Sequence, residues 1–121
     1  MPALDSFDLT MHSPNSDDRP VIVRLMGAAD MLATPRIEKE FEALAARKPA
    51  AVVLDLSGLH YISSLAIGQI VSLWEALRGH NGTVVITNPI HDVRAALDRV
   101  NLGVVVPVVS GAAAYTATAG A

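Results

Sequence analysis

The sequence predicts an α/β domain in which a mostly parallel sheet starts with an N-terminal hairpin and has helices packed on it. Strand-like apolar runs alternate with segments whose apolar residues recur at helical spacing, in the order β-β-α-β-α-β-α-β. The 121 residues are 51% hydrophobic, which suits one buried core. We therefore expect a single domain over residues 1–121, with its core at about 7–108 and a tail at 110–121 that is a short helix or flexible.

The first two strands are expected to pair as a hairpin. Residues 7–12 alternate apolar and polar side chains, as a half-buried strand does, and residues 21–26 form the second strand. The turn-forming residues at 13–20 connect them, and residues 27–30 are expected to break the second strand.

Two of the three expected helices begin at a residue followed by proline. Thr34 is expected to be the N-cap of the first helix, with Pro35 at its first helical position. Asn88 and Pro89 are expected to open the third helix in the same way, and Gly103 is expected to end it.

The second helix is expected to begin at Ser64 and to stop at Gly79. One buried stripe runs along it, and four further apolar residues lie outside that stripe: Leu65, Ala66, Leu73 and Ala76. Such a helix is either buried on two sides or exposes an aliphatic patch that a partner binds.

The remaining strands are expected to be parallel. Residues 51–56 form a continuous apolar run that ends near an acid, as in a strand covered on both faces, and residues 57–62 are expected to be a connection. Residues 83–86 form another buried strand. Residues 104–108 form the last one, at an edge because it contains a proline.

Composition excludes several classes of function. Nine Lys plus Arg against twelve Asp plus Glu give a net charge of −3 without a basic run, so no nucleic acid is expected as a partner. Cysteine is absent and the four histidines are scattered, so no metal site is expected. No nucleotide-binding glycine loop or nucleophile elbow occurs, and we expect no cofactor and no catalytic residue. No apolar stretch approaches a membrane span, which predicts a cytoplasmic protein.

Polar residues follow the ends of the predicted parallel strands. Because those ends share one edge of a sheet, we expect that edge to carry Asp30, Ser57, Ser63, Ser64, Thr87 and Asn88. One of the two adjacent serines is an ordinary N-cap candidate. The same amide-rich helix start also suits a phosphate on serine, and the two interpretations are compatible.

Residues 55–68, Asp-Leu-Ser-Gly-Leu-His-Tyr-Ile-Ser-Ser-Leu-Ala-Ile-Gly, resemble the signature of STAS domains, the family of the anti-sigma factor antagonists. Residues 25–30, Leu-Met-Gly-Ala-Ala-Asp, are similar to the Leu-x-Gly-x-x-Asp of that family. The resemblance extends from about residue 7 to residue 108 and implies the STAS fold.

The resemblance also implies roles for single residues. Ser64 falls on the phospho-acceptor, whereas Ser63 stands where the family usually has Asp and is the alternative acceptor. The partner-binding positions that the resemblance implies are Asp30, Asp55, Ser57, Ser63, Ser64, Leu65, Gly68 and Asn88.

The implied function is regulation by protein binding. Such a domain binds an anti-sigma factor that is also a serine kinase of the histidine-kinase-like ATPase type, and it is released when that kinase phosphorylates it. It is the substrate and not the enzyme. Two alternatives stay open: a constitutive subunit without phosphorylation, in a stressosome-like assembly or a lipid-transport ATPase, and a small-ligand or nucleotide-binding module. The sequence predicts no oligomeric state.

Overall fold

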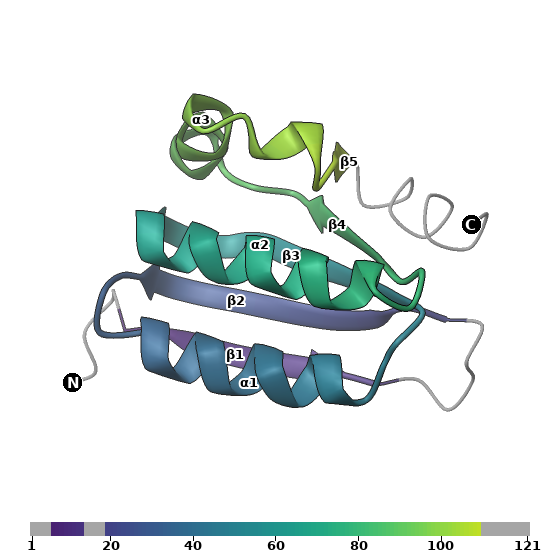
Figure 1. The fold of residues 1–121 in the computed structure, drawn as a ribbon. Helices are drawn as coiled ribbons and strands as arrows, with labels where there is room; N and C mark the ends of the chain where they lie inside the picture. The colour runs from purple at the N-terminus through teal and green to yellow at the C-terminus, as the bar shows by residue number, and fades with distance from the viewer. Residues whose placement is uncertain (1–5, 14–18, 110–121) are drawn as a thin grey trace.

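The protein is represented by a computed structural model that describes residues 6–13 and 19–109 (Figure 1). The predicted tail at 110–121 and most of the first connection lie outside the described residues. In chain order the elements are β1 (Asp8–His12), β2 (Val21–Ala29), α1 (Thr34–Ala46), β3 (Ala51–Ile62), α2 (Ser64–Arg78), β4 (Thr83–Thr87), α3 (His91–Arg99), the 3-10 helix η1 (Leu102–Val104) and β5 (Val108–Val109).

The five strands form one sheet in the order β1-β2-β3-β4-β5. β1 and β2 are antiparallel, and the pairs β2–β3, β3–β4 and β4–β5 are parallel. The predicted fold class, a mostly parallel sheet with an N-terminal hairpin, is confirmed.

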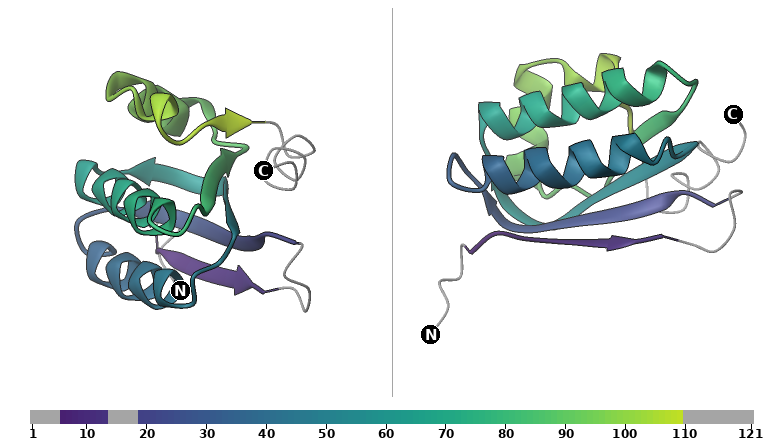
Figure 2. Two further views of the ribbon diagram at one scale, coloured as in Figure 1. Left: turned by 45° about the vertical axis from the view of Figure 1, so that its right-hand side comes forward. Right: turned by 60° about the horizontal axis from the view of Figure 1, so that its bottom comes forward.

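The helices cover one face of the sheet (Figure 2). α1 turns Ile37, Phe41 and Leu44 toward the core, as its apolar spacing predicts. These side chains pack with inward residues of the strands and with the buried stripe of α2. The opposite face carries a smaller apolar cluster around Val53 and Val85. β3 is therefore buried on both faces at that level, as its continuous apolar run indicates.

The two central strands are longer than predicted. β2 continues to Ala29 and β3 to Ile62, although their second halves contain glycine and serine. Two irregularities in the β2–β3 register absorb these residues without ending the strands. Gly27 lies in this stretch with φ +83, and a side-chain carbon on it would overlap the carbonyl oxygen of Ser6. The predictions that the second strand breaks at Gly27 and that residues 57–62 form a connection are wrong because these irregularities keep both strands paired, whereas Asp30 leaves the sheet as predicted.

Two predicted helix boundaries are also wrong. α1 has Ala33 and not Thr34 at its N-cap position, and Thr34 is its first residue. α3 begins at His91 after Ile90, because Asn88 adopts a left-handed conformation with φ 56 that helical residues do not use. α2 begins at Ser64 and ends before Gly79, as predicted.

The end of the described chain contains less strand than predicted. Residues 102–104 form η1 instead of continuing into a strand, and the left-handed residue after α3 is Asn101, with φ 55, in place of Gly103. Among the described residues β5 comprises Val108 and Val109, and it lies at the sheet edge as the preceding Pro107 indicates.

Candidate functional site

The two adjacent serines at the start of α2 have different roles. Ser63 is the N-cap: its backbone is extended, with φ −85 and ψ 163, and its Oγ accepts a hydrogen bond from the Ala66 amide at 3.1 Å. The Ser63 amide donates to the Ala29 carbonyl oxygen at 2.8 Å, which ties the helix start to the end of β2. Ser64 is the first helical residue and is exposed. Its hydroxyl is thus presented to solvent while Ser63 holds the helix start.

The first turn of α2 favours negative charge. The first hydrogen bond within the helix runs from the Ile67 amide to the Ser63 carbonyl oxygen. The amides of Ser64 and Leu65 come earlier in the helix and have no acceptor inside it. No acidic side chain occupies this turn. Together with the positive end of the helix dipole, these amides suit an added phosphate.

Asp30 lies beside the two serines. It directly follows Ala29, which accepts the bond from Ser63, so the end of β2 and the start of α2 meet at this edge. The Asp30 Oδ1 accepts a hydrogen bond from the Ala33 amide at 3.1 Å, and its backbone oxygen accepts one from the Thr34 hydroxyl at 3.2 Å. The carboxylate that was expected at the edge therefore also shapes the turn into α1.

Asp55 and Ser57 lie elsewhere. They sit in the middle of β3, and the strand continues for seven residues beyond Asp55 to Ile62, about 20 Å along the strand. The Asp55 Oδ2 pairs with Arg24 Nε at 3.2 Å, and its Oδ1 accepts the Ser57 amide at 3.0 Å. Sequence reasoning did not identify Arg24, because only the strand register brings it opposite Asp55.

Thr87 and Asn88 belong with this second group. β4 is short, and its last residue Thr87 pairs with Asp55, far from the end of β3. The Thr87 hydroxyl is buried and has no hydrogen-bond partner among the described residues. The expectation that Ser57, Thr87 and Asn88 share one edge with the two serines is wrong, because neighbouring strands end at different levels.

This separation removes the reason for expecting a small-ligand site. That alternative required Asp30, Thr87 and Asn88 to lie close together. β4 ends where Thr87 pairs with Asp55, whereas Asp30 follows Ala29, which pairs with Ile62 at the far end of β3. Within residues 6–13 and 19–109, no three His, Asp or Glu side chains gather in a way that would hold a metal ion. Among the helices of the described chain, none has both the length and the apolarity to cross a membrane.

Four large apolar side chains are exposed on the segments that adjoin Ser64 in the fold, and we call them the rim patch. They are 54% to 89% exposed and come from the β2–α1 turn, the end of β3 and the first turn of α2: Met31, Leu32, Tyr61 and Leu65. Met31 and Leu65 also line a groove of about 370 Å³ beside α1. Exposed apolar side chains that gather at one place mark interaction sites.

The rest of α2 offers less apolar surface than predicted. Ala66 and Leu73 are buried at 2% exposure, so of the expected outer residues only Leu65 and Ala76 reach the surface. Gly68, one turn after Ser64 on the same helix face, is exposed and has open space around the position of a side chain. Sequence reasoning missed Met31 and Leu32. Two apolar residues in a turn between a strand and a helix are the signal that could have identified them.

Comparisons with known proteins agree with this architecture. The family model of the STAS domain matches residues 13–112. No curated protein matches the chain at a significant level.

Solved structures of anti-sigma factor antagonists have a similar fold. One from Mycobacterium paratuberculosis gives a TM-score of 0.77 at 22% identity and covers 89% of each chain. The anti-sigma factor antagonist SpoIIAA in its unphosphorylated form gives 0.72 at 20% identity and covers 88% of each chain. The phosphorylated form of SpoIIAA, a Bacillus cell fate determinant, gives 0.65 at 19% identity and covers 88% of this chain and 91% of that one.

Proposed function

Because this chain belongs to the STAS domain family, we propose that it is an anti-sigma factor antagonist-like regulator whose protein binding is switched by phosphorylation of Ser64. The observation that carries the proposal is the exposed hydroxyl of Ser64 at the start of α2, on the edge of the sheet where the segments that carry the rim patch meet. We propose that the partner is an anti-sigma factor that is also a serine kinase of the histidine-kinase-like ATPase type, which acts on this domain in the cytoplasm.

A protein related in fold supports the two states. SpoIIAA has been solved in both an unphosphorylated and a phosphorylated form. In this chain Ser64 meets the structural requirements of an acceptor, because it is exposed and precedes the first amide that bonds within the helix. In the reaction, the Ser64 Oγ attacks the γ-phosphorus of ATP. The hydroxyl proton is lost and ADP leaves.

The phosphate would act on binding through charge. It adds roughly −1.5 to −2 charges next to Leu65, at the edge of the sheet that carries the rim patch. A partner that covers the rim patch would have to remove water from this charge. Burying an unpaired charge costs free energy, so the affinity of the partner should fall. The core beneath is unaffected, because Ser64 is exposed and makes none of the described cap bonds. Phosphorylation therefore releases the partner and leaves the domain folded.

A phosphorylation assay tests the acceptor. Incubation with the cognate kinase and ATP should add one phosphate, detected by intact-mass measurement and assigned by fragmentation to Ser64. Ser64→Ala should abolish the addition. Ser63→Ala should retain it, because Ser63 contributes a cap and not the acceptor hydroxyl. A phosphate that persists in Ser64→Ala and disappears in Ser63→Ala would assign the switch to Ser63.

A constitutive subunit is the second candidate function. The observation that favours it is Ser63 itself, which stands where the family usually has Asp and which uses its hydroxyl on the Ala66 amide. Such a domain would bind through the rim patch without a switch, in a stressosome-like assembly or a lipid-transport ATPase. Copurification of the unmodified protein with components of such a complex, and no phosphate in the assay above, would support this candidate.

A further inference from the structure

β1 forms an open edge of the sheet. It stands at one end of the strand order and pairs with β2 alone. One side of its backbone therefore has no strand partner within the described part of the chain. An edge of this kind presents N–H and C=O groups to which another extended chain can add.

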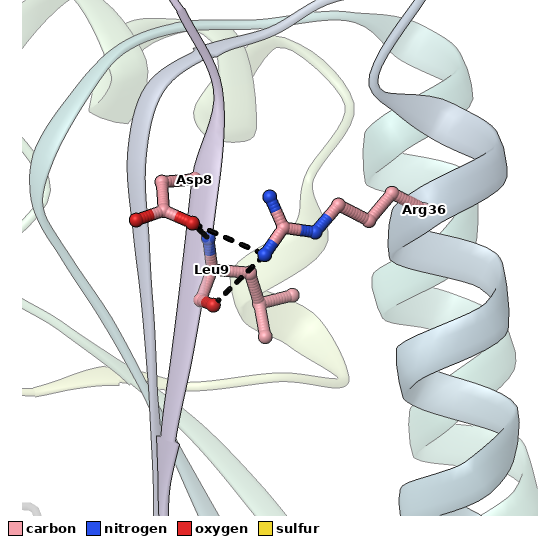
Figure 3. Close-up of polar contacts among 3 residues, drawn as sticks. All are labelled: Asp8, Leu9 and Arg36. Atoms are coloured by element: carbon pink, nitrogen blue, oxygen red, sulfur yellow. Dashed lines mark hydrogen bonds and ion pairs between the residues drawn. The ribbon is translucent and has the colours of Figure 1, made fainter.

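The edge is blocked at Leu9 (Figure 3). The Leu9 amide donates to Asp8 Oδ1 at 2.8 Å, and Arg36 Nη2 donates to the Leu9 carbonyl oxygen at 3.3 Å and to Asp8 Oδ1 at 3.1 Å. Residues of an antiparallel strand alternate between bonding the neighbouring strand and facing away from it. The N–H and C=O groups of Leu9 point away from β2, since the side chains of Asp8 and Arg36 bond to them. The groups that a new strand would use here are already bonded.

Arg47, the residue that follows α1 at its C-terminal end, reaches the other end of β1. Arg47 Nη2 donates to Ser13 Oγ at 2.8 Å, and Arg47 Nη1 lies 3.6 Å from Met11 Sδ. Arg47 follows Arg36 by eleven residues, or about three helical turns, so the two side chains leave the helix and its C-cap in nearly the same direction, about 16 Å apart. The backbone from Asp8 to Ser13 spans about the same length, roughly 17 Å. One face of the helix thus places a guanidinium at each end of the open edge.

These contacts contribute little to the stability of the fold. The side chains of Arg36 and Asp8 are 47% and 58% exposed, and ion pairs in water are weak. The two side chains lie where a further strand would approach β1. Their main effect is therefore on whether another strand can pair with β1. The other sheet edge has a different protection, because within the described residues β5 has only two residues and follows Pro107.

We propose that Asp8, Arg36 and Arg47 keep a second copy of this chain from adding its β1 to the open edge. The occupant that they exclude is another β1, because two identical strands can pair antiparallel about a two-fold axis. Without the three side chains, the outward backbone groups of Leu9 lose their side-chain partners, and no guanidinium contacts the Met11 and Ser13 side chains. The outward groups of Leu9 and Met11 can then bond the same groups of the second copy.

The test compares the self-association of the protein with that of the triple variant Asp8→Ala/Arg36→Ala/Arg47→Ala by sedimentation equilibrium. The natural sequence should stay monomeric at every protein concentration measured. The triple variant should form a dimer, with a dissociation constant at least tenfold lower than that of the natural sequence. Circular dichroism checks that both are folded. The double variant Arg36→Ala/Arg47→Ala keeps the bond between Asp8 and the Leu9 amide, and it should give an intermediate tendency to dimerise.

A matched control removes the same residue types from α3, where no strand edge is involved: Asp98→Ala/Arg94→Ala/Arg99→Ala. Its net charge equals that of the triple variant, and it should remain monomeric. Amide hydrogen exchange then locates the contact, because the amides of Leu9 and Met11 should exchange more slowly in the dimer.

Three results would overturn the proposal. The triple variant stays monomeric at all concentrations, the natural sequence already pairs through β1, or a dimer forms in which the β1 amides gain no protection. Dimerisation of the α3 control to the same extent as the triple variant would show a general charge effect and would count against the proposal equally.

Discussion

At the scale of single residues, the site depends on which of two neighbouring serines performs which task. Ser63 and Ser64 are chemically identical, and the sequence alone leaves both as N-cap candidates. The extended backbone of Ser63 and its bond to Ala66 settle the cap in the structure. Ser64, one position later, has a helical backbone and points an exposed hydroxyl outward.

The cap makes a measurable contribution. Ser63→Ala should lower the free energy of unfolding by about 1 kcal/mol, because the Ala66 amide loses its acceptor. Urea denaturation followed by circular dichroism measures the change. Ser72→Ala, an exposed serine further along α2, is the matched control and should stay within about 0.5 kcal/mol of the natural sequence. Equal losses in both variants would show that Ser63 is not the cap.

At the scale of elements, the long central strands separate the two polar groups. β3 continues to Ile62 through Ser57 and Gly58, which are turn-forming residue types and which the sequence analysis assigned to a connection. Hydrophobic periodicity reports which face a residue occupies, but it does not report bulges or the level at which neighbouring strands end. The sequence could therefore predict that Ser63, Ser64 and Asp30 lie at one edge of the sheet. It could not predict that Asp55 lies beside Arg24 and Thr87.

The bulged stretch of β2 depends on glycine. Gly27→Ala should lower the free energy of unfolding by at least about 2 kcal/mol, because alanine is strained at φ +83 and its methyl group would overlap the Ser6 carbonyl oxygen. Gly103→Ala is the control, since open space surrounds that position and it should change stability by less than about 0.5 kcal/mol. Thermal unfolding of the two variants side by side makes the comparison, and a Gly27→Ala protein as stable as Gly103→Ala would contradict the bulge.

Gly68 should behave in the opposite way. It lies inside α2 with no heavy atom near the position of a side chain, so Gly68→Ala should raise the free energy of unfolding by about 1 kcal/mol through helix propensity. Chemical denaturation measures the gain. A loss of stability would show that the exposed face of α2 is packed against something in the folded protein.

At the scale of the whole molecule, the architecture followed from patterns that extend over many residues. Alternating strand and helix periods, one apolar stripe per helix and the proline before β5 predicted the order of the elements and the mostly parallel sheet. What the sequence could not supply depends on contacts between distant segments. The pairing of Arg24 with Asp55 and the contacts of Arg36 and Arg47 with β1 are of this kind.

The central claim concerns charge at one position of the folded domain. Partner affinity should depend on negative charge at Ser64, because that side chain is exposed at the same edge of the sheet as the segments that carry the rim patch. The same charge at Ser72, which is also exposed on α2 and lies about 12 Å further along the helix, should matter much less.

Calorimetric titration of the partner into three variants tests this claim most directly. Ser64→Asp should weaken binding more than tenfold, or about 1.4 kcal/mol, whereas Ser64→Ala and Ser72→Asp should bind like the natural sequence. Equal dissociation constants for Ser64→Asp and Ser64→Ala would show that Ser64 is not a switch, whatever its position on the helix.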